Sequence, residues 1–316
     1  MLKTIFFGTP ETAVPFLKAL AARTQVLTVI SQPDKPAGRG LSIVPTPVKA
    51  AALELGLKVL QPSKPSEIAA ELAALAPDLA VVVAYGRLLR RDVLEVPKLG
   101  TMNAHFSLLP KYRGAAPVQW SLVRGEKRTG VTLFWLDEGM DTGPIQSVLK
   151  TEVGPDEDAA CLLSRLTQLG VGLLDKTLID IEAGSVVRAP QQGCATLAPL
   201  IKREDARLDL SRPASEIHDL VRGFRLWPRA YLENRDGRLL VLKTAIAGPR
   251  DLVGSGRPGT VLSVERGRGI LVQCGFRSRL WFLDVQPEGK KALNAADFSN
   301  GLRLAVGGFL PFVDGT

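Results

Sequence analysis

Asn103, His105 and Asp141 are the residues of this sequence best suited to act together in a chemical reaction. Asn103 and His105 are two positions apart at the end of an apolar segment, so in a β-strand both side chains would point to the same face. An amide donor and an imidazole could then converge on one atom of a ligand. Asp141 lies in the acidic turn 137–143, and its carboxylate could hold the imidazole in one tautomer and raise its pKa.

Each of these residues, taken alone, also fits a structural role. Asp and Gly are common in turns, and a histidine at a strand end can be a satisfied interior residue. His105 is one of only two histidines, and the other, His218, lies on a predicted helix where we expect it to be structural. The loop 106–114 that follows His105 is too apolar for a simple solvent-exposed connection, and it favours a pocket for a flat ligand.

The elements that must position these residues alternate between strands and helices. Thr9, Thr46 and Ser66 could each cap a helix, and further helices are expected at 87–96 and 157–182. Apolar strands are expected at residues 2–7, 26–30, 58–60, 79–84, 101–105, 129–136 and 144–153. This alternation predicts an α/β fold with an open, mostly parallel Rossmann-like sheet and helices on both faces. Ligands of such sheets bind at the carboxyl ends of the strands, where the first two candidate residues lie.

The chain changes character after residue 187. Periodicity is lost around Pro190 and Pro199, and a helix at 213–223 is followed by short strands, punctuated by glycine, between 238 and 285. Such strands predict a small β-barrel. We therefore expect a first domain over residues 1–187, a linker over 188–205 and a second domain over 206–316.

The net charge of +8 is unevenly distributed. Residues 1–187 hold 20 Lys and Arg against 19 Asp and Glu, whereas residues 188–316 hold 20 against 13. A basic second half suits contact with a polyanion, although solubility alone would tolerate it. The three cysteines have no C-x-x-C spacing, which favours neither a disulfide framework nor a zinc cluster. No apolar run approaches the roughly 20 residues of a membrane span, so we expect a cytoplasmic protein that does not engage a membrane.

The connection 32–41 after the second strand is long for a loop between a strand and a helix. Its Lys35 and Arg39 could contact phosphate, or they could simply be solvated. Gly8 precedes a predicted helix, but the pattern Gly-x-Gly-x-x-Gly is absent, so we do not expect a nicotinamide site.

Several motifs, in this order, resemble those of the methionyl-tRNA formyltransferases. The matching segments are 7–10, 32–40, 84–86, 103–110, 112–117 and 141–143, followed in the second half by 202–207, 222–224 and 295–298. The resemblance implies that the formyl group of the cosubstrate 10-formyltetrahydrofolate is transferred to the α-amine of initiator methionyl-tRNA. It also implies that Asn103, His105 and Asp141 are catalytic.

The same resemblance suggests binding residues for both substrates. It implies that the second domain is an OB-like barrel that binds tRNA and that Lys35 and Arg39 reach the tRNA acceptor end. Separately from the resemblance, we expect a monomer. Leu41 and Ser42 stand where family members often carry lysines, which leaves Arg39 as the clearest cation of its loop. The residues implied to bind folate are Tyr85, Gly86, Ser107, Leu108, Leu109 and Pro110.

Formyl transfer is an acyl transfer, in which a neutral amine attacks a carbonyl carbon and negative charge develops on its oxygen. We expect Asn103 and protonated His105 to stabilise this charge. Asp141 would orient His105, keep it charged near neutral pH, and take the proton of the amine directly or through a water. No metal is required.

Two alternatives remain open at this point. One is a folate-dependent formyltransferase that acts on the amine of a small nucleotide or nucleotide sugar, for which neither the basic second half nor the long loop would be required. The other is an RNA-binding protein without enzymatic activity, against which the intact set of Asn103, His105 and Asp141 argues.

Overall fold

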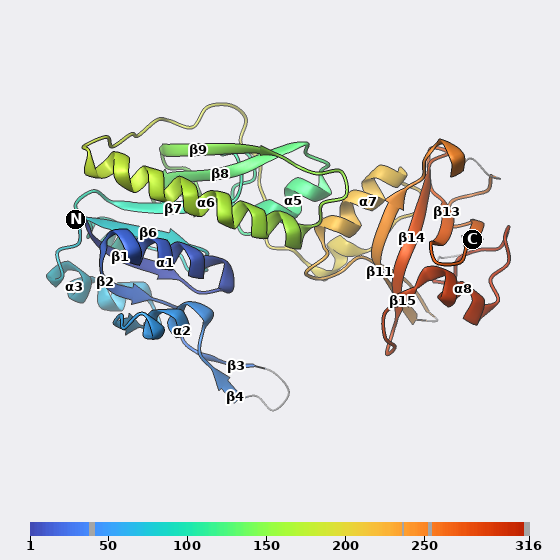
Figure 1. Cartoon of the computed structure of the whole chain (residues 1–316), viewed down its shortest axis with the longest axis horizontal. Helices are drawn as coiled ribbons and strands as arrows, with labels where there is room; N and C mark the ends of the chain where they lie inside the picture. The colour runs from blue at the N-terminus through green and yellow to red at the C-terminus, as the bar shows by residue number, and fades with distance from the viewer. Residues whose placement is uncertain (38–41, 236, 252–254, 313–316) are drawn as a thin grey trace. The chain divides into compact units, whose positions relative to one another are not determined.

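The computed structural model describes residues 1–37, 42–235, 237–251 and 255–312, which form two compact units. The first unit comprises residues 1–117, 128–152 and 163–199, and the second comprises 118–127, 153–162 and the chain from residue 200 (Figure 1). Arg39 lies outside the described residues.

The first unit is built on a seven-stranded sheet of order β5-β2-β1-β6-β7-β8-β9. The first five of these strands are parallel, and β8 and β9 are antiparallel to their neighbours. The sheet is therefore mostly parallel, as expected. The strands are β1 (Lys3–Gly8), β2 (Gln25–Ile30), β5 (Val59–Leu60), β6 (Leu79–Val83), β7 (Thr101–His105), β8 (Arg128–Trp135) and β9 (Ile145–Glu152).

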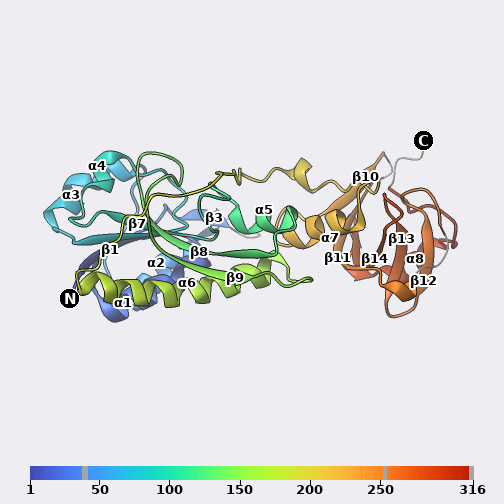
Figure 2. The same ribbon diagram turned by 90° about the horizontal axis from the view of Figure 1, so that it is seen from above.

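Helices cover both faces of this sheet, because its strands are apolar on both sides (Figure 2). On one face, α3 (Ala69–Ala74) and α4 (Arg91–Leu94) pack against Ile5, Phe7 and Val82. α1 (Val14–Arg23) and α6 (Ala159–Glu182) lie together on the other face (Figure 2). They pack closely, because a Cβ at Gly170 of α6 would come 2.6 Å from the ring of Phe16 in α1. The other helical segments are η1 (Glu11–Ala13), α2 (Pro47–Glu54) and η2 (Pro65–Ile68).

Three local expectations are wrong. Thr9 does not cap a helix: its hydroxyl donates to the carbonyl of Tyr85 (3.0 Å), and the chain enters α1 through the 3₁₀ turn η1. Ser66 lies inside η2 instead of capping a helix. The helix expected at 87–96 shrinks to the single turn α4, since positive φ at Gly86 and irregular backbone precede it. Thr46, by contrast, caps α2 by accepting a hydrogen bond from the Lys49 amide (3.2 Å).

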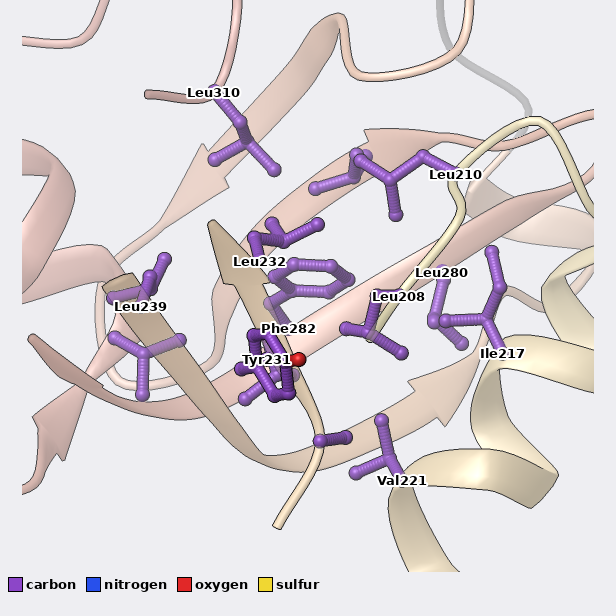
Figure 3. Packing of buried hydrophobic residues seen from close by; sticks show 14 of the residues in the cluster. Leu208, Leu210, Ile217, Val221, Tyr231, Leu232, Leu239, Leu280, Phe282 and Leu310 are labelled. Carbon is purple, nitrogen blue, oxygen red and sulfur yellow. The ribbon is translucent and has the colours of Figure 1, made fainter. Parts of the chain in front are cut away.

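The second unit is built on a separate, smaller antiparallel sheet of order β10-β11-β14-β13-β12, with β15 paired to β14. Its core lies between this sheet, α7 and the extended segment that carries Leu208 and Leu210, as Figure 3 shows. Ile217 and Val221 reach this core from α7, and Phe282 from β14. The elements are α5 (Pro117–Val123), η3 (Arg203–Ala206), α7 (Ala214–Gly223), β10 (Tyr231–Asn234), β11 (Gly237–Ile246), η4 (Pro249–Asp251), β12 (Val261–Glu265), β13 (Gly269–Gln273), β14 (Arg279–Pro287), β15 (Leu293–Asn294) and α8 (Ala295–Leu302).

Two parts of the first unit that were expected to be irregular have a defined path. Part of the long connection forms a hairpin of β3 (Lys35–Ala37) and β4 (Ser42–Val44). The segment 188–199 is hydrogen bonded to the first unit: Ala189 exchanges two backbone bonds with Ile145 (2.7 and 2.9 Å), and Ala198 donates to the carbonyl of Arg113 (2.7 Å). These bonds fix the segment beside the end of β7.

Candidate active site

Strand β7 brings the Asn103 and His105 side chains to the carboxyl end of the sheet, between parallel β6 and antiparallel β8. His105 is 5% exposed, its ring meets Phe134 edge to face, and its Nε2 donates to the carbonyl oxygen of Tyr112 (2.9 Å). Asn103 is half-buried, and its side-chain amide makes no hydrogen bond with the residues that the structure describes. The amide is thus available to a ligand, whereas the imidazole is already anchored.

Asp141 lies against the imidazole, as the sequence predicts. Its Oδ2 is 3.7 Å from His105 Nδ1, too far for a hydrogen bond, but it accepts one from the backbone amide of Gly114 (2.7 Å). Asp141 has a φ of +53°, a conformation in the left-handed region that L residues seldom adopt. The carboxylate is therefore fixed by the backbone of the loop that follows β7.

Gly114 is the residue that allows these two loops to meet. It has a φ of +118°, and a Cβ at this position would come 2.7 Å from the carbonyl oxygen of Ala198. Only glycine combines this φ with so close a backbone approach. Its amide can therefore point at the Asp141 carboxylate.

Burial changes the electrostatics that the sequence suggests for His105. Its pKa is lowered from the ordinary value, because removal from water disfavours the charged ring more than the Asp141 carboxylate and the Tyr112 carbonyl favour it. The expectation of a raised pKa is therefore wrong. At neutral pH the imidazole is neutral.

The residues expected to bind folate lie in two groups. Tyr85 is 1% exposed, stacks edge to face with Phe7, and has a buried hydroxyl with no partner among the described residues. Gly86 follows it at a φ of +77°, where a Cβ would come 2.6 Å from Gln32 Nε2, which donates to the Tyr85 carbonyl. Burial raises the pKa of the Tyr85 phenol, so the group remains a hydrogen-bond donor.

The second group, 107–110, packs mostly into the protein. Ser107 is fully buried and donates to the Lys111 carbonyl (2.6 Å), and Leu109 and Pro110 are also buried. Leu108 is half-buried, with a methyl group that a Cβ at Gly130 would meet at 2.5 Å. The buried side chains of this segment therefore hold the loop after β7 against the protein interior.

A cavity of about 650 Å³ opens at the start of β7, at the opposite end of this strand from His105. It is lined by α4, by the chain leading into Thr101 at the start of β7, by the turn 135–139 and by Arg188, whose guanidinium stacks on Trp135 at 4.2 Å. None of the six expected folate residues lines it. It adjoins the acidic turn that carries Asp141.

The hairpin that carries Lys35 is anchored at its base. Asp34 forms an ion pair with Lys49 and accepts a hydrogen bond from Gln61 (2.7 Å), and these contacts lower the pKa of its carboxyl group. Lys35 itself is exposed. The structure does not describe Arg39, so it does not place the two expected tRNA contacts together.

Sequence reasoning missed two polar residues of this site. Gln191 bridges Arg113 to the carbonyl groups of Asp141 and Gly143, and the hydroxyl of Thr196 accepts from the Tyr112 amide (2.9 Å). Both residues lie in the segment expected to be a linker. The loss of periodicity there concealed them, and a glutamine has no local signal that reports a bridge to residues about 50 positions earlier.

Comparison with known proteins assigns the chain to a family. Residues 2–178 match the formyl transferase family, and residues 200–303 match the formyl transferase C-terminal domain. A methionyl-tRNA formyltransferase of Geobacter sulfurreducens is 46% identical, covering 97% of this chain and 96% of its own. That of Elusimicrobium minutum is 42% identical, over 97% and 98%. The chain belongs to the methionyl-tRNA formyltransferase family. It is a folate-dependent formyltransferase.

Solved structures share the fold of this formyltransferase. An N-formyltransferase from Helicobacter canadensis, in complex with folinic acid and dTDP-3-aminofucose, has a TM-score of 0.68 at 19% identity over 91% of this chain and all of its own. HypX from Aquifex aeolicus in complex with tetrahydrofolic acid has a TM-score of 0.63 at 17% identity, over 97% and 48%.

No helix among the described residues is both long and apolar enough to cross a membrane. No cluster of three or more His, Cys, Asp or Glu side chains in that part of the chain could hold a metal ion.

The two buried histidines predict how the stability of this formyltransferase depends on pH. Burial is the first cause of a lowered pKa at both His105 and His218. As the pH falls through about 6.5, the unfolded chain takes up protons that the folded chain refuses, so the folded state loses stability. We expect the free energy of unfolding to fall between pH 7 and 5.5, by at most about 1.4 kcal/mol per pH unit for each histidine.

Urea unfolding at several pH values measures this dependence. His105→Gln and His218→Gln should each flatten it, and the double variant should flatten it most. A double variant with the slope of the parent protein would contradict this account.

Proposed function

We propose that the protein transfers the formyl group of 10-formyltetrahydrofolate to the α-amine of methionine carried by initiator tRNA. Relatives named methionyl-tRNA formyltransferase match the chain over nearly its whole length, including the basic second half. The observation that carries the proposal is the convergence of a free amide, a buried imidazole and an anchored carboxylate at the end of β7. Such a set can stabilise charge on a formyl oxygen and accept a proton from the amine that attacks the formyl carbon.

In the proposed reaction, the neutral amine attacks the formyl carbon and the Asn103 amide donates to the oxygen on which charge develops. Neutral His105 can take up a proton from a solvent water as this happens, because the new negative charge offsets the burial that lowers its pKa. Asp141 orients His105 and, directly or through a water, takes the proton that the amine releases. The bond from the formyl carbon to the folate nitrogen then breaks, and that nitrogen takes the proton that Asp141 accepted from the amine. The proton on His105 returns to solvent as the charge on the formyl oxygen disappears.

We place the folate against the acidic turn 137–143, which lines the 650 Å³ cavity at the start of β7 and also carries Asp141, so that its formyl group can reach the other end of this strand. The buried Tyr85 hydroxyl, which has no described partner, and the sharp turn at Gly86 support their assignment to the folate site. Segment 107–110 would act by shaping the loop, with Leu108 nearest to the ligand. The reaction as proposed uses no metal.

The proposal assigns tRNA binding to Lys35, Arg39 and residues 206–316. Residues 1–187 are catalytic in this division, and 188–205 connect the two parts. The charge supports this division, because residues 188–316 carry an excess of 7 positive charges and residues 1–187 an excess of 1. We also propose that the protein is cytoplasmic and acts as a monomer.

A panel of acceptors tests the substrate class. Purified protein with 10-formyltetrahydrofolate should formylate methionyl initiator tRNA, and should leave methionyl elongator tRNA and glycinamide ribonucleotide unmodified, as measured by formyl transfer from labelled folate. Preferred formylation of the small ribonucleotide would refute the proposal in favour of a small-amine acceptor.

Asn103→Ala tests the oxyanion role. Removing one such donor typically lowers turnover by about 100- to 1,000-fold, so kcat should fall by this factor with little change in the melting temperature. Asn300→Ala, at an exposed position of α8, is the control and should keep full activity. An Asn103→Ala enzyme within a few-fold of the parent kcat would show that the oxyanion is stabilised by other groups.

The positive excess of residues 188–316 predicts a salt-dependent affinity for tRNA. Each phosphate contact removed lowers the slope of log K against log salt by about 0.9. A triple Gln variant of exposed Arg266, Arg277 and Arg303 should therefore bind tRNA more weakly and with a shallower slope in filter binding. The control is the same change at three exposed cations of the first unit, Lys18, Arg90 and Lys150. Equal slopes for the two variants would count against the second unit as the tRNA platform.

A further inference from the structure

Gln191 uses its whole side-chain amide to join two loops of the active site. Its Nε2 donates to the carbonyl oxygens of Asp141 and Gly143, both at 2.8 Å. Its Oε1 accepts from Nη2 and Nε of Arg113, at 2.7 and 3.2 Å. Both donor hydrogens and the acceptor are therefore engaged.

The loops that Gln191 joins are the two that meet at the imidazole. Arg113 and Gly114 follow β7, and the Gly114 amide holds the Asp141 side chain (2.7 Å). Gln191 holds the Asp141 main chain from the other side. These two restraints hold the side-chain carboxylate and the main-chain carbonyl of Asp141, which keeps its uncommon φ of +53°.

Gln191 is itself fixed by the backbone of its own segment. Ala189 pairs with Ile145 on one side, and Thr196 and Ala198 pair with the 110–113 loop on the other. Because these anchors are backbone bonds, a change of the Gln191 side chain removes the bridge but leaves the segment attached. The adjacent Gln192 is exposed and forms no hydrogen bond with the described residues.

We infer that Gln191 is a positioning residue: it sets the distance and direction of the Asp141 carboxylate relative to His105 without touching the reacting atoms. This inference rests on the catalytic roles proposed above for Asp141 and His105. It extends the site to a segment that sequence patterns assign to a connection between domains.

Two substitutions at Gln191 isolate the bridge. Gln191→Ala removes it, and Gln191→Glu keeps the size and the acceptor for Arg113 but removes both donors to the 141–143 turn. Since misplacing a reacting group by about 1 Å can cost on the order of 100-fold, both variants should lose about 10- to 100-fold in kcat. KM for folate and tRNA should stay within about two-fold, because a positioning residue acts on the carboxylate and not on binding. Gln192→Ala is the matched control and should retain the parent kcat.

A double-mutant cycle with Asp141→Asn separates positioning from general damage to the structure. If Gln191 acts through the carboxylate, Gln191→Ala should cost little once Asp141 has been replaced. A loss of kcat that adds fully to that of Asp141→Asn would overturn the inference, and so would a Gln191→Ala enzyme with the parent kcat.

A measurement that does not need activity keeps this inference distinct from the proposed reaction. The ring ¹⁵N shifts of His105 should change in Gln191→Ala and Gln191→Glu but not in Gln192→Ala, with His218 as the internal reference. His105 shifts that are identical in all of these proteins would overturn the inference even if the enzyme is active. Absence of formylation in the parent protein would instead refute the proposed reaction.

Discussion

The hydrogen bond from the Gly114 amide to the Asp141 carboxylate is the contact on which the site depends. It joins a loop that follows β7 to a turn that follows β8, and the two are 27 residues apart in the chain. Because β7 and β8 are antiparallel, the loop and the turn leave from opposite ends of this strand pair and must fold back along it to meet. The φ of +118° at Gly114, with the Ala198 carbonyl packed against it, then aims the amide. If any of these conditions fails, the carboxylate no longer faces the imidazole.

Burial makes this anchoring chemically useful. An imidazole as deeply enclosed as His105 prefers to be neutral, and the carboxylate beside it offsets part of that preference. The free enzyme therefore holds a pair whose protonation responds to charge that appears nearby. Charge developing on a formyl oxygen would shift the balance toward the imidazolium, so the stabilisation is greatest when the transition state forms. Interactions that strengthen in this way raise turnover instead of only tightening substrate binding.

What the sequence could predict follows the range of the forces involved. Strand β7 has the expected bounds, and the face shared by Asn103 and His105 follows from the period of two along a strand. The wrong expectations depend on distant partners: Thr9 donates to Tyr85, 76 residues away, in place of capping its own helix. The direction of the His105 pKa depends on how completely the fold encloses it. Gln191 depends on two loops that only the folded chain brings together, so no local pattern could mark it.

The site and the choice of acceptor make different demands on the chain. Attack on a formyl carbon has the same needs for any neutral amine, namely a donor for the oxygen and an acceptor for the proton. The set of Asn103, His105 and Asp141 therefore cannot by itself distinguish a tRNA-borne amine from a small one. Discrimination must come from binding energy realised away from the reacting atoms. In this chain the excess positive charge lies after residue 187, whereas the residues that form the site come from a nearly neutral stretch. For the tRNA acceptor proposed above, such charge would bind phosphates while the site serves the amine.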